Sequence, residues 1–404
     1  MTITFEAEPR EVLETVVQEP RFQSLTQIPL LAPMELGLVT TAFALFGVSS
    51  CVYLIGHLPL FAMWIINGIA IYIAFTPLHD ATHRSLSSNR WLNDAIGTLS
   101  CLLLLPGITT GIYRYLHLEH HRYAGDPEGD PDELFVSAPS WRAVVVTAGL
   151  DVFWTRWYVN HWSERPKSER IEFSACIAVY LAIHVYFLSS PYALQFFLLW
   201  MIPQRIGLFL VAWFFARIQH PKDVRWDTYP FQTTVRIVCS RLADVLMLGQ
   251  ARHCLHHLAP SIPFYRYHKA WAIGQERFET QNVPTRTLWS PSDDLRLPEP
   301  VPESSADTAQ TPLSKNTAFE VELASTGEVL TVGPDEFLID VLHAAGYPVT
   351  CSCTQGMCGS CLTPVLSGEP DHRDFILSDE DHAANDFMTV CVSRAKTDRL
   401  VLDL

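Results

Sequence analysis

Long stretches without charge alternate with polar connections in the first half of this chain. Four runs are apolar and close to the length of about 20 residues that a membrane-spanning helix needs: Leu36–Ile55, Leu60–Phe75, Phe173–Leu188 and Tyr192–Phe215. A tight uncharged turn joins the members of each pair, at residues 56–59 and 189–191. The pattern predicts two membrane-spanning hairpins rather than helices buried in a soluble core.

Lys and Arg set the expected orientation, because these residues concentrate in cytoplasmic connections. Both hairpin turns carry none, whereas the segment His79–Arg170 carries nine. We therefore expect this segment and both termini in the cytoplasm. The shorter apolar run Trp91–Leu105 is expected to be a re-entrant or interfacial helix. Residues 1–34 are acidic and lack the parts of a cleaved signal peptide, so none is predicted.

The pattern changes near residue 290. Residues 290–315 are rich in proline, acidic and small polar residues, as in an extended linker. Short strand-like runs follow at Phe319–Leu323 and Val329–Val332, then a helical stretch from about Glu336 and a last strand-like run at Leu400–Leu404. We predict an N-terminal segment 1–34, a membrane domain 35–289, a linker 290–315 and a C-terminal domain 316–404.

Charge separates these parts as well. Residues 316–404 hold 15 Asp and Glu against 4 Lys and Arg, a net charge of −11 out of −15 for the whole chain. Such a balance disfavours nucleic acid as a partner and suits docking to a basic protein, although a merely soluble acidic surface would look the same.

Four cysteines of the C-terminal domain have the spacing C-x4-C-x2-C, with the fourth after 29 further residues: Cys353, Cys358, Cys361 and Cys391. This is the plant-type [2Fe–2S] spacing, in which one loop supplies three thiolates and a distant segment the fourth. Zinc usually requires two C-x2-C pairs, and one is present. Cys351 lies outside the spacing and is interpreted as a bystander. An iron–sulfur cluster favours a reducing compartment.

The stretch CSCTQGMCGSCLTPVLSGEPDHRD resembles the ferredoxin domain at the C-terminus of phthalate-dioxygenase-type and vanillate-demethylase-type reductases. The resemblance covers about 90 residues and implies an α+β domain of the β-grasp type that carries one electron at a time. Those reductases also have flavin and nucleotide domains. This chain shows no G-x-G-x-x-G segment for a nucleotide of its own.

Eight of the sixteen histidines form three clusters. The first, HDATH, places two imidazoles at positions i and i+4, and the two HxxHH clusters each place three on one helix face: His79, His83, His117, His120, His121, His253, His256 and His257. Neutral imidazole is a common iron ligand, and eight of them could hold two ions without bridging carboxylates.

These clusters, with HHRYAGDPEGDPD and HHLAPSIPFYRYHKAW, are similar to the boxes of the membrane fatty-acid desaturase and hydroxylase superfamily. The resemblance runs from about Leu36 to Tyr267. It implies an integral membrane all-α domain of four transmembrane helices with a cytoplasmic helical cap that holds two non-haem irons. His220, after the fourth span, matches a position where family members place an additional ligand. The implied location is a bacterial inner membrane.

Four carboxylates near the clusters are candidates for orienting imidazole N–H groups. We expect this of Asp80 and Glu119, whereas Asp126 and Asp130 are interpreted as solvated loop acids.

The combination predicts an O2-dependent oxidoreductase that abstracts hydrogen from an unactivated C–H bond of a lipophilic or acyl substrate. The tethered ferredoxin would supply the electrons and be recharged by a separate flavin-dependent NAD(P)H ferredoxin reductase. The resemblance of HDATH and HHLAPSIPFYR to desaturase motifs favours a desaturase. A hydroxylase or demethylase of the same superfamily and a membrane-anchored electron carrier are the alternatives.

Overall fold

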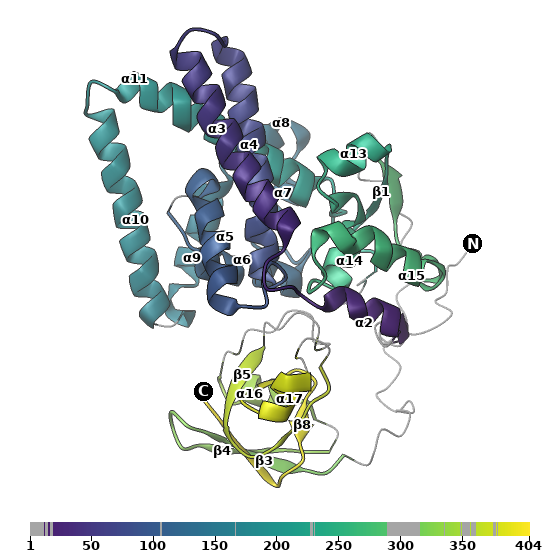
Figure 1. Ribbon diagram of the computed structural model, residues 1–404. Helices are drawn as coiled ribbons and strands as arrows, with labels where there is room; N and C mark the ends of the chain where they lie inside the picture. The colour runs from purple at the N-terminus through teal and green to yellow at the C-terminus, as the bar shows by residue number, and fades with distance from the viewer. Residues whose placement is uncertain are drawn as a thin grey trace.

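A helical unit and a smaller sheet-containing unit make up the molecule (Figure 1). The computed structural model describes residues 12, 15, 16, 19–105, 107–165, 167–226, 229, 231–288, 316–334, 336–347, 349, 356, 361–374, 377 and 379–404. The predicted linker 290–315 therefore lies outside the described residues.

Four helical stretches of the described chain are long and apolar enough to cross a membrane. They are α3 (Pro33–Leu54), α4 (Leu60–Thr82), α10 (Lys167–Leu188) and the continuous stretch Ala193–Arg217. Helix α10 buries only Phe173, and apolar residues along it face outward, as a lipid-facing helix requires. These stretches match the four predicted runs, but α4 continues seven residues beyond the predicted end at Phe75 and so includes His79.

The fourth stretch is not a regular α-helix. It consists of α11 (Ala193–Phe196), a π-helical turn η2 (Phe197–Met201), α12 (Ile202–Val211) and a second π-helical turn η3 (Ala212–Arg217). Such wider turns are rare in proteins overall, but those that occur often lie at functional sites. Here η3 directly precedes the segment that carries His220.

Glycines allow α4 and α12 to approach closely. A Cβ atom on Gly68 would lie 2.5 Å from the side chain of Ile206, and one on Gly207 would lie 2.4 Å from that of Ile71. Small residues at such crossings let two backbones come together. The contact holds the ends of the two helices beside each other, where the histidines lie.

The remaining helices surround the ends of these long ones. They are α2 (Pro20–Thr26), α5 (Arg90–Leu104), α6 (Thr110–Tyr123), α7 (Glu133–Ser137), α8 (Ser140–Ala148), α9 (Leu150–Asn160), η1 (Trp162–Glu164), α13 (Arg241–Leu246), η4 (Gln250–Arg252), α14 (His253–Leu258), η5 (Phe264–Arg266) and α15 (Tyr267–Thr280). Strands β1 (Arg236–Val238) and β2 (Thr285–Thr287) pair in parallel among them. Helix α5 replaces the predicted run Trp91–Leu105; its 15 residues span about 22 Å, less than a bilayer core.

A five-stranded sheet forms the second unit, in the order β4-β3-β9-β5-β7. The strands are β3 (Phe319–Leu323), β4 (Val329–Val332), β5 (Leu362–Ser367), β7 (Phe387–Thr389) and β9 (Arg399–Leu402), with β6 (Pro370–Asp371) and β8 (Arg394–Ala395) as a separate pair. Helices α16 (Leu338–Ala344) and α17 (Asp379–Ala384) complete it. The alternating burial of β3 shows why its predicted bounds coincide with the observed ones.

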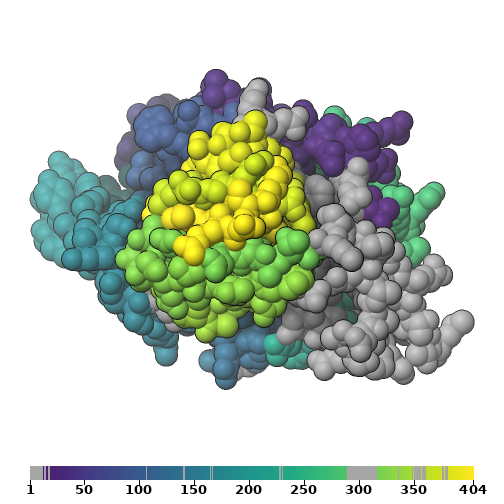
Figure 2. Space-filling view, turned by 90° about the horizontal axis from the view of Figure 1, so that it is seen from below, coloured from purple at the N-terminus to yellow at the C-terminus, as the bar shows by residue number. Residues whose placement is uncertain are grey.

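The sheet unit lies below the helical unit in Figure 1, with the β3–β4 hairpin on its far side and β5 toward the helices. Seen from below, it covers the middle of that face of the helical unit (Figure 2).

Candidate metal centres

Nine buried histidines from four segments of the helical unit meet at one place. They are His79 and His83 at the end of α4, His117, His120 and His121 on α6, His220 after η3, and His253, His256 and His257 on α14. These are the nine predicted ligands. Whether each binds iron stays a prediction, but their convergence is a finding.

The first group holds the ring nitrogens of His79, His83, His117 and His256, which lie within 4.8 Å of one another. His121 also points into this group, because its Nε2 atom lies 2.7 Å from Nε2 of His256 and 3.1 Å from Nε2 of His117. Five imidazoles from three helices therefore face one small space.

The second group holds the ring nitrogens of His120, His220, His253 and His257, again within 4.8 Å of one another. The Nε2 atoms of His220 and His257 lie 3.1 Å apart. His220, which lies outside the three sequence clusters, is thus brought into the second group by the end of the fourth long stretch.

The size and chemistry of both groups fit a metal ion. An ion held about 2.1 Å from each nitrogen separates opposite ligand atoms by about 4 Å, which is the scale of these groups. The Nε2 atoms of His79, His83 and His253 are buried without a hydrogen-bond partner among the described residues, which is costly unless something else binds them. The donor set is all imidazole, which suits iron.

Burial also favours the neutral form that binds metals. Burial, and then the neighbouring imidazoles, lower the pKa of seven of these histidines: His83, His117, His121, His220, His253, His256 and His257. His120 is the exception. Burial disfavours its protonated form, but the carboxylates of Asp130 and Asp132 outweigh this effect and raise its pKa to about 9.

Outer hydrogen bonds orient several rings through Nδ1, as is usual for metal-binding histidines. Asp130 lies 2.8 Å from Nδ1 of His120 and also accepts backbone N–H groups from Gly125 and Asp132. Asp130 is buried, so its interpretation as a solvated acid is wrong. The tight turn after α6 folds the carboxylate back onto the helix, which spacing alone does not reveal.

The other three candidate acids have different kinds of partner. Asp80 lies 3.4 Å from Nδ1 of His79 and accepts the backbone N–H of Phe264, so it links the first cluster to the segment after α14. Asp126 instead binds Arg225 and nearby backbone N–H groups, in agreement with its interpretation as a loop acid. Glu119 lies 4.0 Å from Arg122.

Two orienting residues were missed in the sequence. Gln250 Oε1 lies 2.6 Å from Nδ1 of His253, and the hydroxyl of Tyr267 lies 2.9 Å from Nδ1 of His256. Tyr267 falls within the motif HHLAPSIPFYRYHKAW, so its presence was visible although its contact was not. Gln250 precedes its histidine by three residues, one turn of a helix, which is the only local signal for it.

The sheet unit brings the described cysteines of the predicted cluster together. Cys361 directly precedes β5 and Cys391 follows β7 by two residues, and the antiparallel pairing of Leu362 with Thr389 places both at one end of the two strands. Both cysteines are buried. Cys353 and Cys358 lie outside the described residues.

Gly356, between those two cysteines, shows how closely the loop is held. Its φ is +69°, and a Cβ atom there would lie 2.7 Å from the side chain of Val392 and 2.9 Å from Cα of Asp374. Only glycine fits such a position without strain. Gly356 therefore packs against Val392, the residue after Cys391, and this agrees with a cluster that takes ligands from both segments.

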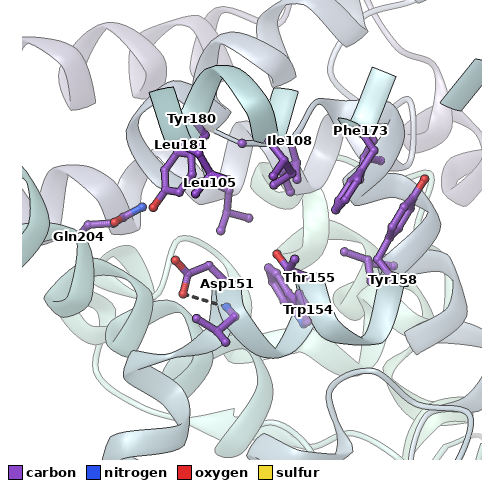
Figure 3. Close-up of a pocket in the computed structure, with 15 residues that line it drawn as sticks. Leu105, Ile108, Asp151, Trp154, Thr155, Tyr158, Phe173, Tyr180, Leu181 and Gln204 are labelled. Atoms are coloured by element: carbon purple, nitrogen blue, oxygen red, sulfur yellow. Dashed lines mark hydrogen bonds between the residues drawn. The ribbon is translucent and has the colours of Figure 1, made fainter. Parts of the chain in front are cut away.

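A cavity of about 260 Å³ is lined by residues of α6, α9, α10 and α12 (Figure 3). Helix α9 contributes Asp151, Trp154 and Thr155, and α10 contributes Phe173 and Tyr180, among mostly apolar lining residues. Figure 3 shows Gln204 and Asp151 at one end, with Phe173 and Tyr158 at the other.

Two aromatic rings separate the cavity from the histidines. The Trp154 ring lies 5.1 Å from that of Tyr113, which stacks at 5.6 Å on His117. Leu116, the residue before His117, also lines the cavity. A bound molecule would thus lie near the first histidine group.

Comparison with known proteins assigns families to both units. The family model described as "Fatty acid desaturase" matches residues 32–289, and the model "2Fe-2S iron-sulfur cluster binding domain" matches residues 321–396.

Individual relatives match about 90 residues. The vanillate O-demethylase oxidoreductase of Pseudomonas sp. (strain HR199 / DSM 7063) is 56% identical over 22% of this chain and 27% of its own length. A protein of Aquincola tertiaricarbonis, described as a tert-butanol monooxygenase / tert-amyl alcohol desaturase reductase subunit, is 48% identical over 21% of this chain and 25% of its own. The solved phthalate dioxygenase reductase is 43% identical over 22% of this chain and 27% of that one, with a TM-score of 0.22. The chain thus spans about a quarter of the length of these relatives.

Proposed function

Because this chain belongs to the fatty acid desaturase family through residues 32–289, we propose that it is a membrane desaturase that removes hydrogen from an unactivated C–H bond. The chain is an oxidoreductase whose cofactors are a diiron centre and one [2Fe–2S] cluster. The observation that carries the proposal is the convergence of nine buried histidines into two groups of ligand-sized spacing. When bound, the two irons supply O2 activation and the oxidising power for C–H cleavage.

The residues of this chain hold and orient that centre. We assign His79, His83, His117, His121 and His256 to one iron, and His120, His220, His253 and His257 to the other. Asp80, Asp130, Gln250 and Tyr267 fix the ring orientations through Nδ1. Cys353, Cys358, Cys361 and Cys391 would hold the cluster.

We assign the cavity of Figure 3 to the substrate. Its lining supports a lipophilic or acyl substrate, with an apolar group held among Ile108, Leu116 and Phe173. Replacing Ile177, which lines the cavity, by Trp should raise KM strongly, because the larger ring fills the space. Val145→Trp on the exposed face of α8 is the matched control and should leave KM unchanged.

Electrons would come from the fused unit. A [2Fe–2S] cluster carries one electron, so two deliveries are needed per turnover, and the tether keeps the donor near its acceptor at about millimolar effective concentration. A separate flavin-dependent NAD(P)H reductase would recharge the cluster. We propose that residues 290–315 link the membrane domain 35–289 to the ferredoxin domain 316–404. We also propose that the histidine clusters, both termini and the ferredoxin domain lie on the cytoplasmic side of a bacterial inner membrane.

Hydroxylation is the second candidate, because the same histidine arrangement serves either outcome after hydrogen abstraction. The description of the Aquincola tertiaricarbonis relative names both a monooxygenase and a desaturase, which supports keeping the two together. Incubation with substrate and ¹⁸O2, followed by mass spectrometry of the product, separates them. A double bond without label supports the desaturase, and label retained in the product would establish the hydroxylase.

A membrane-anchored electron carrier is the weakest of the three functions, because a carrier has no use for two groups of buried imidazoles. Metal analysis tests it: zinc or a haem Soret band in place of iron in the helical unit would revive it.

A further inference from the structure

The two units touch through a basic and an aromatic side chain. The guanidinium carbon of Arg90 lies 4.4 Å from the ring centroid of Phe387. Arg90 is the first residue of α5 in the helical unit, and Phe387 is the first residue of β7 in the sheet unit. A cation over an aromatic face at this distance is an attractive contact.

On the sheet side, this contact lies close to the cluster. Strand β7 is the edge strand of the five, and it leads from Phe387 through Val390 to Cys391. The strand ends at Thr389 and the chain then turns, so Cys391 lies within about 13 Å of Phe387 along the chain. The edge that meets the helical unit is therefore the edge that carries a cluster cysteine, whereas the β3–β4 hairpin points away (Figure 1).

On the helical side, a short chain of bonds leads from Arg90 to the first histidine group. One turn along α5, the Asn93 amide donates to the carbonyl of Ala81 at 2.7 Å. Arg114 donates to the same carbonyl and to that of Thr82, both at 2.9 Å. The next residue after Thr82 is His83, so the route ends on a histidine of the first group.

Charge supports the same pairing. Arg90 is exposed at the contact, and Arg114 adds a second positive charge where its guanidinium binds the carbonyls of Ala81 and Thr82. Asp94 pairs with Arg114 there. The sheet unit carries a net charge of −11, and its exposed Asp386 directly precedes Phe387. Complementary charge of this kind steers docking and fixes its register.

We propose that the contact between Arg90 and Phe387 is the docking site through which the fused [2Fe–2S] unit reduces the iron held by His79, His83, His117, His121 and His256. One electron leaves the reduced cluster, which becomes oxidised, and one ferric ion of that group becomes ferrous. The inference rests on the proposed function, in which electrons come from the fused unit, and adds where they enter.

The test uses the full chain in detergent or nanodiscs. The oxidised chain is mixed without O2 with one electron equivalent of dithionite, and stopped-flow absorbance follows the reduction of the cluster and its reoxidation by ferric iron of the helical unit. Arg90→Glu should slow this reoxidation about tenfold at low salt, and the difference from wild type should shrink as salt rises. Glutamate suits the first turn of a helix, so α5 is expected to stay intact.

Arg241→Glu is the matched control. Arg241 is also exposed and is also the first residue of its helix, α13, which lies away from the sheet unit in Figure 1. The cluster of this control variant should be reoxidised at the wild-type rate. The double variant Arg90→Glu, Phe387→Lys replaces the cation–aromatic contact by a pair of opposite charges and should recover part of the lost rate.

A second readout does not depend on activity. Hydrogen–deuterium exchange of the full chain should show the first turn of α5 and strand β7 both protected in wild type, and both exchanging faster in Arg90→Glu. Equal rates and equal exchange in Arg90→Glu and wild type would overturn the docking site, as would equal slowing in Arg241→Glu. If the wild-type cluster is not reoxidised at all, self-supply of electrons fails, and the exchange experiment still decides whether the units dock here.

Discussion

The two metal-binding regions are built in opposite ways. In the helical unit, histidines from residue 79 to residue 257 meet only because α4, α6, α14 and the end of the fourth long stretch pack together. In the sheet unit, the two described cysteines of the predicted cluster, Cys361 and Cys391, lie at one end of the paired strands β5 and β7. The first centre therefore depends on the packing of a whole domain, whereas the second depends on a local turn and a strand pair.

The comparison predicts that either centre can be removed while the other stays intact. His256 lies in the first group and contacts its neighbours on both α4 and α6. We expect His256→Ala to remove iron from the helical unit and to abolish product formation, because one ligand supplied by a third helix is gone. The iron content should fall, while the visible circular dichroism of the [2Fe–2S] cluster stays unchanged. Loss of that dichroism as well would mean that the two centres are not independent.

The reverse change is Cys358→Ser. It should remove the cluster and abolish turnover, while Mössbauer signals of histidine-bound iron and membrane insertion persist. Normal activity in this variant would show that an outside carrier delivers the electrons and that the fused unit is dispensable.

Asp130→Asn tests whether iron binding in the helical unit depends on the carboxylate that orients His120. The amide keeps the shape but lacks the charge opposite His120, and loss of such an orienting partner typically weakens metal binding by about 10- to 100-fold. The amount of iron that stays bound in the presence of a chelator measures this weakening. Asp126→Asn is the control, because Asp126 contacts Arg225 and backbone rather than a histidine; similar iron loss in both would argue against the orienting role.

Gly356→Ala tests the local nature of the sulfur site. A left-handed conformation and contacts under 3 Å to Val392 and Asp374 make alanine unfavourable by about 1–3 kcal/mol. The cluster should bleach faster on warming, with no change in iron of the helical unit. Gly327 also has positive φ but has no neighbour within 4 Å, so Gly327→Ala separates backbone strain from crowding.

The smallest effect is expected for Tyr267→Phe. It removes one hydroxyl beside Nδ1 of His256 while keeping the buried ring. A several-fold fall in iron affinity, with unchanged thermal unfolding, would fit an orienting role. A large fall in unfolding temperature instead would assign Tyr267 to packing.

Much of the fold and of the candidate site could be predicted from the sequence, because short sequence patterns encode them. Helical spacing placed each histidine cluster on one face, and alternation gave the bounds of β3 and β4. The division of the nine histidines between the two groups could not be predicted from the sequence. His117 and His121 face the first group while His120, on the same helix, faces the second, so one sequence cluster serves both. That division depends on which helices flank α6, and Asp130 and Gln250 depend on turns that spacing does not define.

The parallel pairing of β3 with β9 has a consequence for how such proteins arise. These are the first and last strands of the sheet unit, and they lie side by side, with Glu320 opposite Arg399 and Leu323 opposite Leu402. A unit whose first and last strands pair with each other completes its own sheet and needs no strand from the polypeptide it is joined to. Such a unit can be joined to different hosts as one piece, which agrees with the similarity of about 90 residues of this chain to part of a vanillate O-demethylase oxidoreductase.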